Sequence, residues 1–216
     1  GELAESCADY IKNHDQDNPF FMVSSFINPH DICYMAITDY AEKQGNMDKY
    51  EHNPDYQVLQ NVLEEKDKYD SEQFYNEICP SLPDNLEPQE NEPDAVKRFL
   101  DQRPFRRDAR ENYTDRDWKL HRWAYCRLTE MVDKKIQIIL DALQEKGIEE
   151  ETIIIFSSDH GDHDGAHRME HKSTLYEEVC RIPFIISDNG EKSGVVDNKH
   201  LISNGLDFMV LIQNRW

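Results

Sequence analysis

The stretch from Glu151 to Asp162, ETIIIFSSDHGD, decides the fold. Its apolar and β-branched part predicts a buried strand over residues 152–158, and acidic and imidazole side chains follow the strand at once. In open α/β sheets, ligand sites form beyond the carboxyl ends of strands. We therefore expect a functional loop after this strand, beginning at Asp159 and His160.

Two further apolar runs predict the rest of the sheet. FFMVSSFI, residues 20–27, ends at a turn that carries His30, and PFIIS, residues 183–187, gives a third strand. Because the strands are almost continuously apolar, we expect a largely parallel or mixed sheet that is sandwiched by helices. If the first two strands are parallel, His30 and Asp159 project from the same edge of the sheet.

Helical patterns accompany these strands, which gives an α/β order. Residues 2–13 have an amphipathic pattern, and residues 115–146 carry the longest apolar stripe at helical spacing. Thr114 and Gly147 are suited to cap the long helix at its two ends. A short helix is expected within residues 173–180.

An acidic, proline-containing segment at about residues 40–113 interrupts this order. We expect it to be a solvated surface insertion that is irregular or weakly helical, with one helix near residues 56–68.

The overall charge restricts the class of partner. The 216 residues carry a net charge of −20. Proteins that bind nucleic acid or anionic membranes need a basic surface, so neither is expected as a partner. No apolar run approaches the ~18 residues that span a bilayer, so no membrane span is expected. The five cysteines form no C-x-x-C motif, which argues against a zinc knuckle or a thioredoxin-type site.

The ligand-rich loop suits a metal and an anionic ester. Asp159 and His160 can share one divalent ion, although two ligands are too few for a complete site. Lys172 can neutralise an oxyanion, and His30 can protonate a leaving alkoxide. Further substrate contacts in the same pocket are predicted for three side chains: His163, His167 and Arg168.

Several of these segments together resemble the sulfatases of the alkaline-phosphatase superfamily. The resemblance rests on NPFFMVSSFINPH, the long helix containing ILDAL, ETIIIFSSDHGD and HKSTLYEEVCRIPFIIS, and it runs in order from Gly1 to about Phe208. It implies an alkaline-phosphatase-like α/β fold in which residues 1–216 form part of a sulfatase catalytic domain. It also implies hydrolysis of a small sulfated ester or sulfated oligosaccharide, and a periplasmic or secreted location.

The resemblance implies roles for individual residues. Asp159 and His160 occupy positions of metal ligands, with calcium as the usual metal and manganese or zinc as alternatives. Lys172 occupies the position of the lysine that grips the sulfate, and His30 that of a histidine near the bridging oxygen, a proton donor.

The sequence also departs from the family's pattern. These enzymes use a formylglycine made from a C/S-x-P-x-R motif, which does not occur here, and Cys79-Pro80-Ser81 lacks both the spacing and the arginine. We therefore expect a fragment without the N-terminal formylglycine portion, and no sulfatase turnover from this chain alone.

His160 and the acidic surface leave two alternatives open. Many sulfatases carry asparagine where His160 lies, and related phosphonate and phosphate ester hydrolases carry an imidazole there. The first alternative is therefore a phosphonate or phosphate ester hydrolase of the same superfamily. The second is a non-catalytic module that binds anions or metal ions.

Overall fold

The structure is a computed structural model that describes residues 2–15, 17–188, 194–203 and 205. Its described residues form an α/β arrangement that is rich in helices and has a small sheet. The helices and strands are α1 (Glu2–Asn13), α2 (Cys33–Lys43), α3 (Pro54–Glu64), α4 (Ser71–Gln73), α5 (Asp94–Asp101), α6 (Pro104–Asn112), α7 (Asp115–Lys146), β1 (Ile154–Ser157), α8 (Glu177–Cys180) and β2 (Phe184–Ser187).

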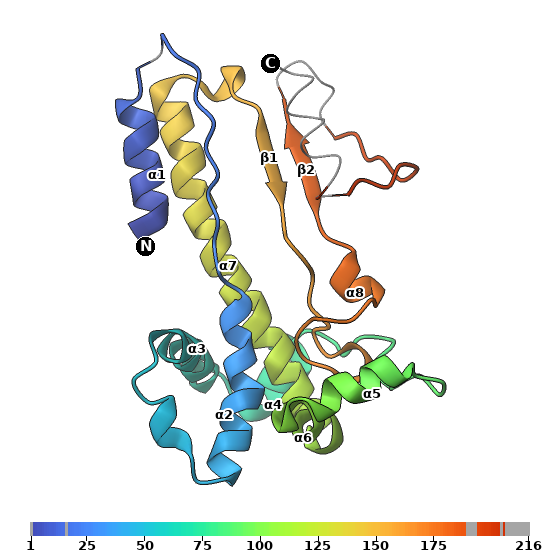
Figure 1. Ribbon diagram of the computed structural model, residues 1–216. Helices are drawn as coiled ribbons and strands as arrows, with labels where there is room; N and C mark the ends of the chain where they lie inside the picture. Colours follow the sequence, from blue (N-terminus) through green and yellow to red (C-terminus); the bar gives the residue numbers. More distant parts are fainter. Residues whose placement is uncertain (1, 16, 189–193, 204, 206–216) are drawn as a thin grey trace.

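Helix α7 runs the length of the molecule and connects its two halves (Figure 1). Its 32 residues correspond to roughly 48 Å at the usual rise per residue. Thr114 and Asp117 form a capping box at its start, and Gly147 ends it in the left-handed region with φ of 76°. The predicted bounds and caps of this helix are confirmed. Within the described part of the chain, no helix, α7 included, is both long enough and apolar enough to cross a membrane.

The lower half of the molecule packs helices α2 to α6 around the first half of α7 (Figure 1). Its core contains Leu59, Val62 and Phe74 from the acidic segment, packed with Trp118 and Leu128 of α7. The prediction of an irregular or weakly helical segment at 40–113 is therefore wrong for much of its length. Its description as a surface insertion stays a prediction, but its helices contribute much of this core.

The upper half is built on the second half of α7, against which α1 packs (Figure 1). Ile11 of α1 and Leu143 of α7 lie at the centre of this smaller core. Phe20 and Met22 pack on it from one side, as does Ile154 of β1. The predicted helix at residues 2–13 is confirmed as α1.

Strands β1 and β2 pair antiparallel, with Ile154 opposite Ser187 and Ser157 opposite Phe184. The predicted strands at 152–158 and 183–187 are thus confirmed with shorter bounds, but the parallel pairing we expected is not observed among the described residues. The predicted helix at 173–180 is reduced to the single turn of α8.

Residues 20–27 were expected to form a buried strand, and this prediction is wrong. The segment is extended and runs beside α7 toward α2 (Figure 1), but no described strand pairs with it. Alternate side chains face away from the helices, so Phe21, Val23 and Ile27 are 63%, 71% and 75% exposed. The composition and the alternation are those of a strand, but a strand also requires a hydrogen-bonding neighbour.

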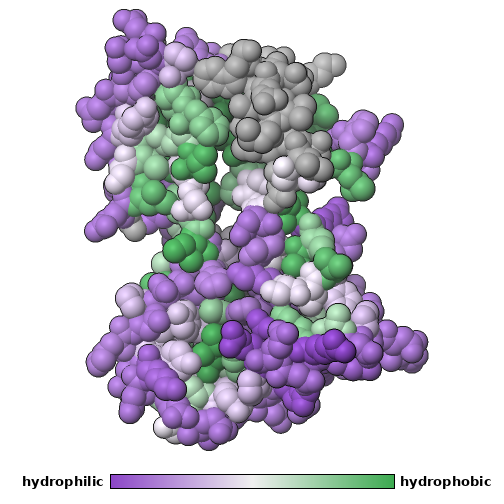
Figure 2. All heavy atoms as spheres, viewed as in Figure 1, coloured by the Kyte–Doolittle hydropathy of each residue, from purple (hydrophilic) through white to green (hydrophobic). Residues whose placement is uncertain are grey.

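A groove of about 1400 Å³ separates this segment from β1, with α7 beneath it. Apolar side chains line most of it, and Figure 2 shows green atoms on both sides of the hollow in the upper part of the molecule. The groove continues past the end of β1 into the ligand-rich loop, where its lining becomes polar.

Candidate active site

Four predicted site residues line the polar end of the groove: His30, Asp159, His160 and Lys172. His30 begins a 3₁₀ turn directly after the extended segment, and Asp159 and His160 follow β1. The extended segment and β1 run in the same direction in Figure 1, so their carboxyl ends meet at one end of the groove. The structure therefore brings together residues that lie up to 142 positions apart in the sequence.

His30 and Lys172 are in direct contact. The Nζ atom of Lys172 lies 2.9 Å from Nδ1 of His30. An ammonium group can only donate, so Nδ1 accepts, and in the neutral ring the proton resides on Nε2. Burial lowers the pKa of His30, and the positive charges of Lys172, His171 and His160 lower it further.

Asp159 and His160 lie side by side after β1. Nε2 of His160 is 3.5 Å from Oδ2 of Asp159, while Nδ1 lies 2.8 Å from the carbonyl oxygen of Gly161. Because a carbonyl accepts, Nδ1 carries the proton of the neutral ring, and the lone pair of Nε2 is left on the side of the carboxylate.

This arrangement fits two ligands of one divalent ion, since a histidine ligand commonly donates its other N–H to a carbonyl. Among the described residues, no group of three or more His, Cys, Asp or Glu side chains could hold a metal ion. The part of the chain that the structure describes thus offers a pair of donors and not a complete site. The predicted metal-binding role of Asp159 and His160 stays a prediction.

Gly161 fixes the path of the chain behind this pair. Its backbone N–H donates to the carbonyl of Val179 at 2.7 Å. A Cβ atom at this position would lie 2.0 Å from the backbone oxygen of Glu178, so no larger residue fits here without displacement. The residue after His160 is therefore a glycine because two backbone segments approach closely.

The loop that carries Lys172 has an unusual backbone. Five non-glycine residues have positive φ: Asp164, His167, Arg168, His171 and Ser173. Two of them, His171 at 81° and Ser173 at 80°, flank Lys172 directly. Such conformations are unfavourable for L-residues, so contacts elsewhere in the loop must stabilise them.

His163 and His167 supply two of these contacts and are buried. Nε2 of His163 lies 2.8 Å from Oγ1 of Thr174, and burial lowers the pKa of His163 to about 4. The ring of His167 stacks on Tyr176 with the centroids 4.4 Å apart. Neither histidine lines the groove.

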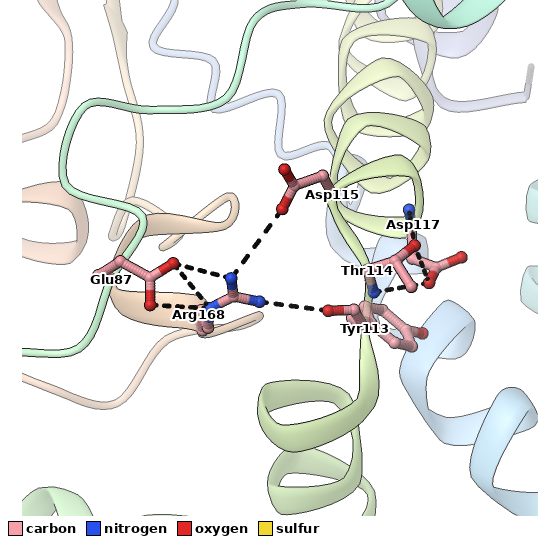
Figure 3. Close-up of polar contacts among 6 residues, drawn as sticks. All are labelled: Glu87, Tyr113, Thr114, Asp115, Asp117 and Arg168. Carbon is pink, nitrogen blue, oxygen red and sulfur yellow. Dashed lines mark hydrogen bonds and ion pairs between the residues drawn. The ribbon is translucent and has the colours of Figure 1, made fainter.

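Arg168 is bound to the lower half of the molecule (Figure 3). Its guanidinium donates to both carboxylate oxygens of Glu87 and to the carbonyl of Tyr113, and Asp115 lies 3.9 Å away. It does not line the groove either. The contacts of His163, His167 and Arg168 support a structural role in the loop, and their predicted role in substrate binding stays a prediction.

Buried charges lie between the loop and α7. His121 of α7 is buried, and its Nδ1 is 3.6 Å from Oδ1 of Asp164. Burial acts to lower the pKa of His121, but the carboxylates of Asp164, Asp162 and Glu170 outweigh burial and raise it. Burial also raises the pKa of Asp162. The pair of His121 and Asp164 attaches the loop to α7.

No role for His171 or Glu170 was predicted from the sequence, yet His171 lines the same end of the groove. Its ring centroid is 6.2 Å from that of His30. Its position next to Lys172 was the only available signal. That signal is weak, because neighbouring side chains in an extended chain point to opposite sides.

Comparison with known proteins gives a consistent result. The family model described as Sulfatase matches residues 1–209. The Delta 4,5-hexuronate-2-O-sulfatase of Bacteroides thetaiotaomicron is 25% identical over 203 residues, which are 92% of this chain and 36% of that protein. An arylsulfatase of Clostridium perfringens is 28% identical over 187 residues, covering 84% of this chain and 30% of the relative.

A crystal structure of a Bacteroides thetaiotaomicron protein assigned as a sulfatase has a similar fold. It superposes with a TM-score of 0.68 at 24% identity, over 92% of this chain and 37% of that one. The chain thus spans about a third of the length of the proteins it matches. The predicted α/β fold of the alkaline-phosphatase type is confirmed by this likeness.

Proposed function

Because the chain belongs to the sulfatase family, we propose that it forms part of the active site of a sulfuric ester hydrolase. The observation that carries the proposal is the contact between Lys172 Nζ and His30 Nδ1, 2.9 Å apart at the polar end of the groove. This contact joins an ammonium group to an imidazole that carries its proton on Nε2, which suits an anionic ester with a leaving alkoxide.

Lys172 and His30 have different roles in this proposal. One N–H of the Lys172 ammonium donates to His30, and the other two are free to stabilise the non-bridging oxygens of the sulfate group. An oxygen nucleophile bonds to sulfur as the bond between sulfur and the bridging oxygen breaks. Nε2–H of His30 gives its proton to the leaving alkoxide while Nδ1 takes a proton from the Lys172 ammonium, so the ring stays neutral. Burial and the neighbouring cations lower the pKa of His30 and so favour the neutral ring, which is why the proton that it gives up has to be replaced from Lys172.

Asp159 and His160 are proposed as two ligands of a divalent ion, with calcium preferred and manganese or zinc as alternatives. When bound, such an ion stabilises negative charge on the sulfate oxygens. The nucleophile is proposed to be a formylglycine contributed by polypeptide beyond residues 1–216, because the motif that yields it does not occur among them.

The proposed substrate is a sulfated sugar. The relative from Bacteroides thetaiotaomicron is named for a hexuronate carrying a 2-O-sulfate, and it matches 92% of this chain. The strongly acidic surface would repel a densely sulfated polymer, so a short oligosaccharide is favoured over a long one.

The test uses the intact protein and a pair of lysine variants. We expect the protein to release sulfate from a 2-O-sulfated unsaturated hexuronate disaccharide or from an aryl sulfate. Lys172→Met should lower kcat/KM by about a hundredfold or more, as for loss of a donor to a developing oxyanion. Lys134→Met, at an exposed position on α7, should leave kcat/KM unchanged.

Two outcomes would refute the proposal. Faster hydrolysis of a phosphonate or phosphate monoester than of any sulfate ester would favour phosphorus chemistry at this site. No hydrolysis at all, together with sugar binding that does not depend on Lys172, would favour a binding module.

A further inference from the structure

We propose that His171 is a further substrate-binding residue of this site, which donates a hydrogen bond from Nε2 to an oxygen of the sulfate group. The inference rests on the proposed sulfatase function and adds a third hydrogen-bond donor to Lys172 and His30. It is carried by the way in which Glu170 and α6 fix the His171 ring at the groove.

A buried carboxylate orients the ring. Nδ1 of His171 lies 2.5 Å from Oε2 of Glu170, and the two side chains are 11% and 1% exposed. At this distance the carboxylate and Nδ1 form an ion pair when the ring is protonated, although the contact does not have the geometry of a hydrogen bond. Nε2, on the opposite side of the ring, then has no hydrogen-bond partner among the residues that the structure describes.

Helix α6 holds the carboxylate and the ring from behind. Nε of Arg106 lies 4.0 Å from Oε1 of Glu170, and the guanidinium covers the ring of Phe99 at 3.9 Å. Phe105, the neighbour of Arg106, meets the His171 ring edge-on with the centroids 6.3 Å apart. A histidine that served only as packing would not need a fully buried acid directed at one of its nitrogens.

The backbone turns the ring toward the same place as Lys172. His171 has φ of 81°, a conformation that few non-glycine residues adopt, and both it and Lys172 line the groove. In an extended chain, two successive side chains would point to opposite sides. The strained backbone thus directs two neighbouring side chains, His171 and Lys172, toward the same part of the groove.

The charges at this end of the groove suit an anion. The side chains of Lys172, His30 and His171 lie together, with the rings of the two histidines 6.2 Å apart. In the protonated ring of His171 both nitrogens carry a proton: Nδ1 faces the carboxylate of Glu170, its ion-pair partner, and Nε2 can donate to the ligand. A sulfate group bound at this end of the groove could accept hydrogen bonds from all three side chains.

Two substitutions separate the two nitrogens. His171→Asn keeps an amide near the position of Nδ1, so the contact with Glu170 survives, while the group at Nε2 is lost. His171→Gln places its amide near Nε2 and gives up the contact with Glu170. Asparagine also tolerates positive φ, so the first variant should fold.

The measurements are KM for the sulfate ester, kcat, and the inhibition constant of inorganic sulfate in the intact protein. For His171→Asn we expect KM and the inhibition constant to rise about tenfold or more, because a hydrogen bond to a charged group is lost. The kcat of this variant should stay within about threefold of the wild-type value. His171→Gln should stay within about threefold of the wild type in both constants. His52→Asn, at an exposed position away from the groove, serves as the control.

An unchanged inhibition constant in His171→Asn, in an enzyme that hydrolyses sulfate esters, would refute this inference alone. Equal loss in both variants together with a lower Tm would also refute it, because it would assign His171 a structural role through Glu170. Wild-type protein that neither hydrolyses sulfate esters nor binds sulfate would refute the proposed function and this inference with it.

Discussion

Replacing Gly161 with alanine tests whether the loop behind Asp159 and His160 depends on close contact between two backbone segments. The new Cβ atom would lie 2.0 Å from the backbone oxygen of Glu178 and 3.0 Å from its carbonyl carbon. Contacts below 3.0 Å are essentially never observed for Cβ atoms, so the two segments must separate by about 1 Å or more. The obstacle is backbone, which cannot rotate away as a flexible side chain could.

The expected loss of stability follows from what this separation disrupts. The backbone bond from Gly161 N–H to the carbonyl of Val179, now 2.7 Å, would lengthen beyond a useful distance, at about 1 kcal/mol. Overpacking of a tight contact adds about 1–3 kcal/mol. The sum is a decrease of about 2–4 kcal/mol in the free energy of unfolding. Activity should fall as well, because Asp159 and His160 directly precede the displaced residue.

Urea unfolding of the intact protein, followed by circular dichroism, measures this decrease. Gly147→Ala is the matched control, because Gly147 has φ of 76° and no atom within 4 Å of the added Cβ. That variant should lose about 1–2 kcal/mol from backbone strain alone, with normal activity. A smaller loss in Gly161→Ala than in Gly147→Ala, with activity retained, would refute the steric explanation.

Two further predictions concern stability. Burial lowers the pKa of His163 to about 4, so between pH 6.5 and 4 the unfolded chain binds more protons than the folded one, and stability falls as the pH falls through that range. At pH 5 the loss in the free energy of unfolding is about 2 kcal/mol. The difference in stability between the wild type and His163→Gln, measured by urea unfolding, should therefore shrink by that amount from pH 7.5 to pH 5. The same pH dependence in both proteins would contradict the lowered pKa of His163. Thr114→Ala removes the hydroxyl that, with the Asp117 side chain, forms the capping box at the start of α7. This variant should lower the free energy of unfolding by about 1 kcal/mol, whereas Thr114→Ser should not. Equal thermal unfolding curves for the two variants would show that the capping box contributes nothing.

The features that the sequence predicts best are those that neighbouring residues determine. Thr114, the apolar stripe and Gly147 specify α7 within one continuous segment, and its observed bounds agree with the prediction. The position of Asp159 and His160 at the end of β1 is equally local, because they directly follow the strand. Their approach to His30 and Lys172 followed from a general property of α/β sheets.

Features that depend on distant partners were predicted less well. The segment 20–27 has the composition and alternation of a strand, but the sequence cannot show whether a hydrogen-bonding neighbour is present. The acidic segment was expected to be solvated because charge dominates its composition. Leu59 and Val62, three positions apart on one face of α3, are nevertheless buried against α7, since a narrow apolar face suffices for packing.

His171 was missed for a related reason. Its role depends on Glu170 being buried and on a positive φ, and neither property has a signature in one sequence, because glutamate is rarely buried and histidine rarely adopts that conformation. Arg168 shows the opposite error. A guanidinium in a ligand-rich loop suggests a substrate contact, but here Glu87 and the carbonyl of Tyr113 occupy it.

These errors have a common cause, which concerns how the fold supports the site. A loop with several non-glycine residues at positive φ keeps its shape only where surrounding contacts outweigh the strain. Those contacts come from the acidic segment and α6: Glu87 binds Arg168, and Arg106 lies beside Glu170. The segment that the sequence suggested was peripheral therefore holds the loop that presents Lys172, through Glu87 and through Arg106 of α6. It follows that substitutions at Glu87 or in α6 can alter the proposed sulfate binding without touching a residue that lines the groove.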